Sequence, residues 1–401
     1  MHALIIGAGI AGPATAMALQ QVGIDATVVE AHQHGDAEVG SYLTVTPNGL
    51  DALAAIGALS LAVEIGSPTR DNVMRDDAWR VLGRLPLGAP LADGTPALTL
   101  KRSRLARRLA DLATERGVRL VEGRRFVSAR RVGESVVATF DDGSTETADL
   151  LIGADGVHSV VRRLIDPTAP AGRYVGLTNF GGLTRAAAVP AGVEAIEPET
   201  WQFGFGRRAF FGAHRLPSGD IVWFVNAPRP EIAPAERAGT DAATWQAWLA
   251  SLFAGDAGPA TALIRAGVLE LAADNTYDLA TVPVWHRDRM IVIGDAAHAP
   301  APSSGQGASM AMEDGVLLAI ALRDASSIEA AFAAFEAGRR ARVEKIVAYG
   351  ARSSSSKTPG RVGRAVQGVA MRILFRWVIT ERSLAWMYGH RVGGEPAVLG
   401  R

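Results

Sequence analysis

The chain has 401 residues, of which 48% are hydrophobic and 20% are charged, so it can bury a large core and is not expected to be disordered. Its 41 basic and 41 acidic residues balance, which argues against nucleic acid as the main partner. The chain contains no cysteine, which excludes disulfides, thiolate nucleophiles and thiolate metal sites.

The sequence shows no signal-peptide pattern and no uninterrupted apolar run of membrane-spanning length. We therefore expect a cytoplasmic protein without integral membrane association, present as a monomer or homodimer. His2, His32 and His34 have no partner at ligand spacing, so no metal site is expected.

The first expected element is a buried strand over residues 3–6, which is followed by the glycine motif Gly7-x-Gly9-x-x-Gly12. Gly7 allows a tight turn, Gly9 lets backbone amides approach a pyrophosphate, and Gly12 lets helix and strand pack closely. Glu30 follows the second expected strand, where its carboxylate can accept hydrogen bonds from a ribose diol. The motif predicts a dinucleotide-binding βαβ unit, which could take NAD or FAD.

Further along the chain, helical spacing predicts a helix over residues 103–116, and alternation predicts a strand over 134–140. From about 172 to 270, aromatic residues gather in short alternating segments, which predicts a largely antiparallel sheet. The remaining expected elements are a helix at 244–254, a buried strand at 290–293, helices at about 306–323 and 328–349, a polar linker at 353–356 and a helical region at 361–388.

A second motif follows the strand at 290–293 and favours a flavin over NAD. Asp295 is placed to accept hydrogen bonds from the ribityl hydroxyls of a flavin. A glycine-rich loop then leads into a helix that begins near Gly307. The backbone amides from Gly305 to Ala308, with the helix dipole behind them, can face the flavin edge that becomes anionic on reduction.

A third motif is Gly153-Ala154-Asp155-Gly156, with Ser159 and Arg162 behind it. Together, the motifs GAGIAG, GADG..S..R and GDAAH....PSSGQG resemble those of the class A FAD-dependent monooxygenases, the para-hydroxybenzoate hydroxylase-like aromatic hydroxylases. The resemblance covers residues 1–350 in outline. It is strong for the FAD-binding half and generic for residues 172–270.

The resemblance implies an α/β fold, in which a Rossmann-like FAD-binding domain of the GR2 type carries an inserted β-sheet substrate domain and C-terminal helices. The implied ranges are 1–70, 100–171 and 275–350 for the FAD-binding domain, 71–99 and 172–274 for the substrate domain, and 351–401 for the C-terminal segment. It also implies that non-covalent FAD is held by Gly7, Gly9, Ala11, Gly12, Glu30, Arg102, Asp155, Asp295, Pro302, Gly305, Gln306, Gly307 and Ala308.

The function that the resemblance implies is oxygen insertion. NADPH or NADH reduces the flavin, and O₂ then forms a flavin C4a-hydroperoxide. This species hydroxylates or epoxidises a small to mid-sized organic substrate, expected to be aromatic. The active cavity should lie where the substrate sheet faces the flavin ring. The residues assign no catalytic acid or base.

Three alternatives stay open from the sequence. They are an FAD-dependent reductase of the same fold, a plain NAD-dependent dehydrogenase, and a flavin- or ligand-binding protein without catalysis. A halogenase is disfavoured, because its Trp-x-Trp-x-Ile-Pro segment is absent.

Several residues near these motifs have a plainer interpretation. We expect His298 to shape the loop after Asp295 rather than to react, and His214 and Arg215 to lie in a surface turn before Pro217 rather than to act as base or clamp. Alternation should place only half of Phe203, Phe211, Trp223 and Phe224 towards a cavity. The basic helical stripe from Val362 to Trp377 could bind a membrane surface, but packing on the domain is the expected role.

Overall fold

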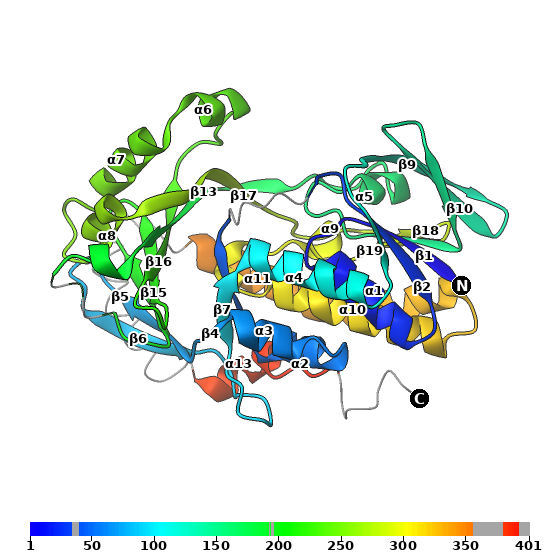
Figure 1. The fold of residues 1–401 in the computed structure, drawn as a ribbon, viewed down its shortest axis with the longest axis horizontal. Helices are drawn as coiled ribbons and strands as arrows, with labels where there is room; N and C mark the ends of the chain where they lie inside the picture. Colours follow the sequence, from blue (N-terminus) through cyan, green and yellow to red (C-terminus); the bar gives the residue numbers. More distant parts are fainter. Residues whose placement is uncertain (34–39, 192, 194–195, 356–379, 393–401) are drawn as a thin grey trace.

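The computed structural model describes residues 1–33, 40–191, 193, 196–355 and 380–392. Two large sheets dominate these residues, one of six strands and one of seven, and they lie at opposite ends of the molecule with helices around them (Figure 1). The α/β class predicted from the sequence is confirmed. No described helix is both long and apolar enough to cross a membrane.

The six-stranded sheet has the order β18-β19-β12-β1-β2-β8. Its strands are β1 (His2–Ile6), β2 (Asp25–Val29), β8 (Arg119–Val121), β12 (Leu150–Gly153), β19 (Met290–Val292) and the antiparallel edge strand β18 (His286–Arg287). The other five strands run parallel, so their carboxyl ends meet at one edge. That edge collects the loops that carry all three sequence motifs, which is where open α/β sheets bind ligands.

Helices α1 (Ala11–Gln21), α4 (Arg102–Glu115) and α10 (Gly307–Asp324) pack on one side of this sheet (Figure 1). A small sheet of β9 (Phe126–Val132), β10 (Ser135–Phe140) and β11 (Thr145–Ala148) packs with α5 (Val160–Ile165) on the other. Cover on both sides explains why residues 3–6, 150–152 and 290–292 of the central strands are all apolar.

The seven-stranded sheet has the order β17-β13-β16-β15-β14-β5-β6 and is antiparallel except for the pair β14–β5, as the alternation predicted. Its strands are β5 (Asp71–Arg75), β6 (Val81–Pro86), β13 (Arg173–Thr184), β14 (Thr200–Phe205), β15 (Phe210–Arg215), β16 (Ile221–Pro228) and β17 (Val268–Asp278). Helices α7 (Ala242–Leu252) and α8 (Ala260–Ala266) lie on its outer side, and α6 (Pro234–Gly239) lies above them at the top of the view (Figure 1).

The remaining helices and strands lie around the two large sheets. They are α2 (Pro47–Ala55), α3 (Leu59–Ile65), α9 (Asp295–His298), α11 (Ile328–Ser355), α13 (Glu381–Tyr388) and the three-stranded sheet of β3 (Tyr42–Val45), β7 (Leu98–Lys101) and β4 (Ser67–Pro68). The linker predicted at residues 353–356 is wrong for 353–355, because α11 continues through them. The predicted basic stripe from Val362 to Trp377 lies outside the described residues.

A buried ionic cluster joins α10 to α11. The Arg339 guanidinium donates to Glu313 Oε2 over 2.7 Å and to Asp314 Oδ1 over 2.8 Å, and all three side chains are at most 2% exposed. Arg342 donates to the other Glu313 oxygen over 2.9 Å. Burial alone would raise the pKa of both carboxyl groups, but the cations around them outweigh it and hold each pKa below its usual range.

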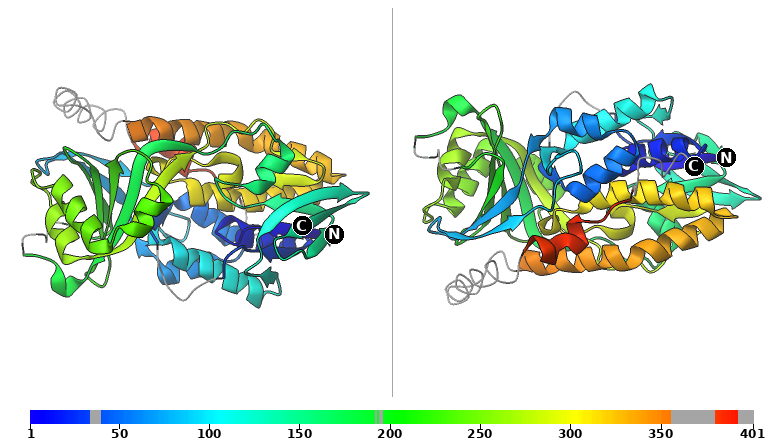
Figure 2. Two further views of the ribbon diagram at one scale, coloured as in Figure 1. Left: turned by 90° about the horizontal axis from the view of Figure 1, so that it is seen from above. Right: turned by 90° about the horizontal axis from the view of Figure 1, so that it is seen from below.

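The same cluster reaches the carboxyl end of β19 and the last described helix. Asp314 Oδ2 accepts hydrogen bonds from the Gly294 amide over 2.8 Å and from His298 Nε2 over 2.6 Å. Arg342 also donates to the Trp386 carbonyl of α13 over 2.7 Å. Figure 2 shows α13 lying beside α11 as a result. One cluster therefore positions the loop after β19, the start of α10 and the C-terminal helix.

Replacing Arg339 by Met should lower the free energy of unfolding by about 3 kcal/mol, because two buried carboxylates lose their shared cation. Urea unfolding followed by circular dichroism measures the change. The matched control is Arg323→Met on the same pair of helices, since Arg323 pairs with an exposed Asp324 and should contribute less than about 1 kcal/mol. Equal effects of the two substitutions would contradict the importance given to the cluster.

Candidate active site

The turn after β1 cannot accommodate side chains at two of its glycines. Gly7 has a φ of +106°, and a Cβ there would lie 2.5 Å from the Ala154 carbonyl oxygen. A Cβ on Gly12 would lie 1.9 Å from the Gly7 carbonyl oxygen. The motif glycines therefore allow the turn, the first turn of α1 and the end of β12 to come into contact.

The remaining glycine of the motif, Gly9, faces open space. A Cβ on Gly9 would meet no atom within 4 Å, and α1 begins at Ala11 with no side-chain cap on its first amides. Glu30 lies beside this turn, because its carboxylate accepts hydrogen bonds from the Ala8 amide over 2.8 Å and the His32 amide over 3.1 Å. Free amides at a helix start, open space and an anchored carboxylate fit the pyrophosphate and ribose of a dinucleotide.

Two carboxyl groups follow neighbouring parallel strands, Asp155 after β12 and Asp295 after β19. Asp155 Oδ2 accepts from the Val160 and Val161 amides over 2.7 and 3.2 Å, whereas its Oδ1 is buried with no partner among the described residues. Burial raises the pKa of both groups, and Arg102 partly opposes this at Asp295. A buried oxygen without a donor, as at Asp155 Oδ1, favours a ligand that donates, and sugar or ribityl hydroxyls can do so.

The loop before α10 forms the next part of the wall. Pro302–Ser304 make a single turn, Gly305 has a φ of +63°, and α10 then begins at Gly307 with no side-chain cap. The uncapped amides and the positive end of the helix dipole suit an anionic ring edge. A Cβ on Gly307 would lie 3.6 Å from Asp295 Oδ1, so this helix start and the β19 carboxyl group are neighbours.

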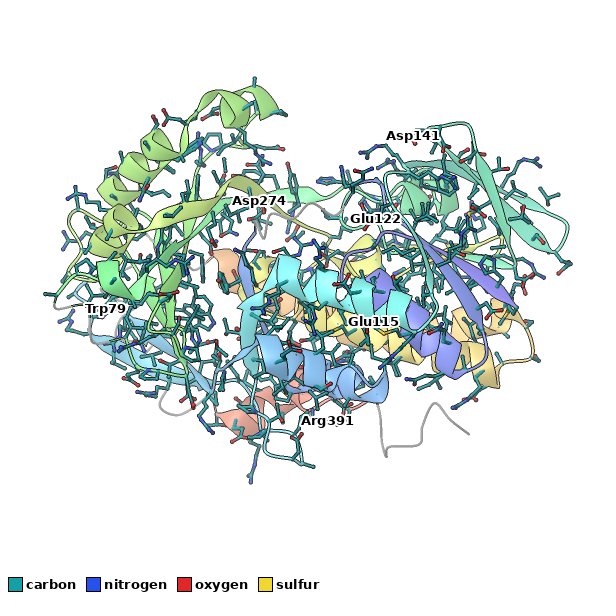
Figure 3. The ribbon with its side chains drawn as sticks, in the orientation of Figure 1. Trp79, Glu115, Glu122, Asp141, Asp274 and Arg391 are labelled. Carbon is teal, nitrogen blue, oxygen red and sulfur yellow. The ribbon has the colours of Figure 1, made fainter. Side chains whose placement is uncertain are left out.

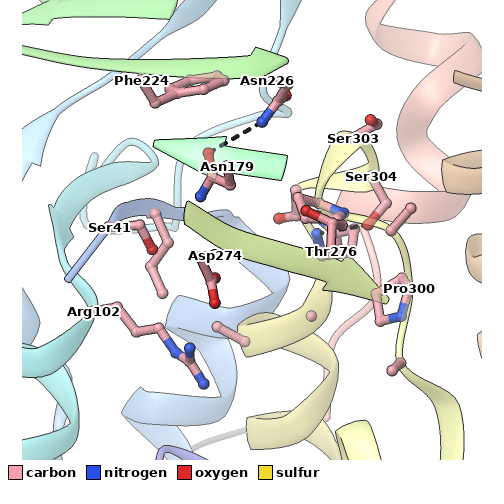
Figure 4. Close-up of a pocket in the computed structure, with 18 of the residues that line it drawn as sticks. Ser41, Arg102, Asn179, Phe224, Asn226, Asp274, Thr276, Pro300, Ser303 and Ser304 are labelled. Atoms are coloured by element: carbon pink, nitrogen blue, oxygen red, sulfur yellow. Dashed lines mark hydrogen bonds between the residues drawn. The ribbon is translucent and has the colours of Figure 1, made fainter. Parts of the chain in front are cut away.

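Eight of the thirteen residues expected to hold FAD line one cavity of about 1230 Å³ in the described structure: Arg102, Asp155, Asp295, Pro302, Gly305, Gln306, Gly307 and Ala308. The other five, Gly7, Gly9, Ala11, Gly12 and Glu30, form the neighbouring turn after β1 and the end of β2. Figure 4 shows Arg102 at the cavity wall, with Pro300 and Ser304 of the loop before α10 on another side. The residues present therefore fit a molecule with the length and polarity of FAD.

The sequence did not reveal the side chains that hold this loop from behind. Asn48 is fully buried, and its Nδ2 donates to Gln306 Oε1 over 2.9 Å and to Glu313 Oε1 over 2.7 Å. Gln306 Nε2 in turn donates to Thr46 Oγ1 over 2.8 Å. Thr46 is the N-cap residue of α2, but its hydroxyl makes no cap bond and binds this loop instead. Ser309 Oγ lies 3.1 Å from the same hydroxyl.

His298 is buried behind the loop and is not a lining residue of the cavity in the described structure. Its bond to Asp314 places it in the ionic cluster, which agrees with the expected loop-shaping role. This position gives it no contact with a reacting substrate.

The opposite wall of the cavity comes from the seven-stranded sheet and is aromatic. Its rings are Trp201, Phe203, Phe205, Phe210 and Phe224. Alternation along the strands turns their neighbours Phe211 and Trp223 to the other face, where they pack with the core under α7 and α8. The expectation that only half of the aromatic residues face the cavity is confirmed.

His214 corrects one expectation. It lies inside β15 rather than in a surface turn, with no exposed surface, and only the following Arg215 is exposed. Its Nδ1 donates to the Thr200 carbonyl over 2.9 Å, and its Nε2 is buried with no partner among the described residues. Burial lowers the pKa of His214 to about 4, so the ring is neutral at pH 7. It does not line the cavity and offers a substrate no base.

His214 should make stability fall in mild acid. Its folded pKa of about 4 lies below the unfolded value of 6.5, so its contribution is complete above pH 6.5 and is lost as the pH falls towards 4. Between pH 7 and pH 5 this loss is about 2 kcal/mol. Urea unfolding at both values should show a smaller acid loss for His214→Phe than for the unchanged protein. An equal loss of stability between pH 7 and pH 5 in the two proteins would contradict the assignment of this acid sensitivity to His214.

Comparison with known proteins agrees with this geometry. The family model described as "FAD binding domain" matches residues 1–349. The FAD-dependent urate hydroxylase of Klebsiella pneumoniae is 32% identical over 354 residues, which cover 86% of this chain and 88% of that protein. The 6-hydroxynicotinate 3-monooxygenase of Pseudomonas fluorescens is 28% identical, with 98% and 96% covered.

A solved structure is similar along almost the whole chain. Klebsiella pneumoniae HpxO complexed with FAD and uric acid has a TM-score of 0.77 and 28% identity, covering 93% of this chain and 92% of that one. The matched family model spans the carboxyl edge of the six-stranded sheet and the loop before α10. The chain belongs to the FAD-binding-domain family and, within it, to the class A FAD-dependent monooxygenases that hydroxylate aromatic compounds.

Proposed function

We propose that this FAD-dependent monooxygenase uses NADH or NADPH and O₂ to hydroxylate a small to mid-sized aromatic or heteroaromatic substrate between its two sheets. One observation carries the proposal: a single cavity joins the polar carboxyl edge of the six-stranded sheet to the aromatic wall of the seven-stranded sheet. Relatives named for urate and 6-hydroxynicotinate support a substrate with one or two fused rings. The proposal places the reaction in the cytoplasm, in a monomer or homodimer.

The proposal assigns the thirteen expected residues to FAD. The turn after β1 and Glu30 would hold its adenosine and pyrophosphate, Asp155 and Asp295 its hydroxyl groups, and the loop from Pro302 to Ala308 its ring. FAD bound there would accept a hydride from the nicotinamide and activate O₂. The chain itself would bind and orient the substrate and keep water out of the cavity.

The proposal divides the chain as the resemblance implied. Residues 1–70, 100–171 and 275–350 form the FAD-binding domain, and 71–99 with 172–274 form the substrate domain, followed by the segment 351–401. Strand membership supports this division. The five parallel strands fall in the first set. Six of the seven strands of the second sheet lie wholly in the second set, and only the end of β17 passes residue 274.

At the substrate end of the cavity, the protein can do two things: keep water out and keep the hydroxyl group of Tyr388 protonated. Trp201 Nε1 donates to Thr44 Oγ1 over 3.0 Å and Thr99 Oγ1 over 2.9 Å, which fixes the indole at the wall. Burial raises the pKa of Tyr388, which also lines the cavity, so its hydroxyl stays protonated. A fixed apolar wall keeps water from the reacting atoms.

Gly9→Ala should weaken FAD binding about tenfold or more, because the new methyl group enters the open space assigned to the pyrophosphate. Its fold should persist, since that Cβ meets no protein atom. The matched control is Gly338→Ala in α11, where a Cβ also meets no atom and should only add about 0.5–1 kcal/mol of helix stability. Flavin fluorescence during reconstitution measures affinity. Unchanged affinity in Gly9→Ala would contradict the assignment.

The holoenzyme should oxidise NADH or NADPH in air, and an aromatic substrate should stimulate this oxidation. Mass spectrometry should then find a product heavier by about 16 Da, the mass of one oxygen atom. Nicotinamide oxidation that persists without O₂ and yields a reduced product would indicate a reductase instead. A flavin-loaded protein that no substrate stimulates would indicate a binding protein.

A further inference from the structure

We propose that the substrate is uncharged where it enters the seven-stranded sheet: an aromatic or heteroaromatic compound without a carboxylate or other fixed charge there, recognised by side-chain amides. This inference rests on the proposed function, because it concerns the substrate end of the same cavity. It would set the protein apart from relatives named for acids such as 6-hydroxynicotinate.

The wall formed by β5, β6 and β13–β16 presents no charged side chain to the cavity within the described residues. Beside the five aromatic rings it offers apolar Met74 and Leu85 and the amides Asn72, Asn179 and Asn226. A carboxylate buried against such a wall would lose its hydration without gaining a cation. That cost is large for an ion and small for a neutral amide or hydroxyl group that finds a hydrogen bond.

The arginines of the same strands and turns are engaged elsewhere and do not line the cavity. Arg84 pairs with Glu197, and Arg207 in the β14–β15 turn pairs with Asp77 over 2.8 Å. Arg75 lies with its guanidinium 5.2 Å from the centre of the Trp79 ring. These strands and turns therefore do contain arginines, but the arginines point to other partners and leave the wall without charge.

The charged side chains that line the cavity come from outside these strands, and one of them, Asp274 of β17, pairs in register with Asn179 of β13. Among the described lining residues, Arg102 and Arg237 are the arginines or lysines, and four carboxyl groups accompany them. Burial raises the pKa of Asp274, and Arg237 and Arg102 only partly oppose this, so all three are neighbours. Figure 3 shows Asp274 between the two halves of the molecule, and Figure 4 places Arg102 and Phe224 at opposite sides of the view. The two arginines of the cavity therefore lie beside Asp274 and belong to none of the strands that carry the aromatic rings.

The side-chain amide of Asn179 is oriented to donate a hydrogen bond to a neutral oxygen of the substrate. Asn226 Nδ2 donates to Asn179 Oδ1 over 3.1 Å, which directs the Asn179 amide nitrogen into the cavity (Figure 4). That nitrogen has no protein acceptor among the described residues, and it can donate to a carbonyl or hydroxyl oxygen of the substrate. Trp201 does not compete for this oxygen, because its N–H is already used by Thr44 and Thr99.

The test compares two probes that share a ring system. The FAD-loaded protein is titrated by calorimetry at pH 8 with 6-hydroxy-2-naphthamide and with 6-hydroxy-2-naphthoate. The amide should bind at least about tenfold more tightly. Equal binding, or tighter binding of the naphthoate, would overturn the inference.

Asn72→Lys should reverse or abolish this preference by adding a cation to the wall, whereas the matched control Asn72→Leu should keep it. Asn179→Leu should weaken amide binding without improving naphthoate binding. A folded Asn72→Lys protein with the original preference would count against the inference.

Calorimetry needs no turnover, so the two proposals fail separately. A preference for the amide in a protein that never oxidises NADH or NADPH would sink the proposed function and leave the inference standing. Hydroxylation of the naphthoate, together with tighter binding of the naphthoate than of the amide, would overturn the inference and leave the proposed function standing.

Discussion

The position of the loop that leads into α10, residues 302–306, depends on one buried interaction, the guanidinium of Arg339 between Glu313 and Asp314. These side chains link α10 to α11, and through Gly294 and His298 they reach the end of β19. Asn48 extends the network to Gln306 and so to the loop itself. Charges buried this deeply are costly unless every lone pair is satisfied, so the network tolerates little displacement of the helix start.

Parallel strands account for the rest of the site. Because β1, β12 and β19 are neighbours with their carboxyl ends on one edge, three motifs about 140 residues apart along the chain come together at the same place. The seven-stranded sheet then supplies the opposite wall. The polar half of the cavity thus follows from strand order, and the apolar half from side-chain alternation.

Much of this could be predicted because the signals are local. The glycine spacing with Glu30, the strand before Asp295 and the alternating aromatic segments each lie within a short stretch of sequence. Asn48 and Arg339 could not be found in this way, since their partners lie in other helices. His214 was misplaced because Pro217 suggested an early turn, whereas β15 continues to Arg215. The serines at 353–355 suggested a linker, but α11 includes them.

The two faces of β14, β15 and β16 have separate duties. One face stabilises the fold against α7 and α8, and the other lines the cavity. Substitutions at every second position can therefore reshape ligand preference while the packed face stays as it is. Such a division lets new substrate specificities evolve while the fold and its stability are preserved.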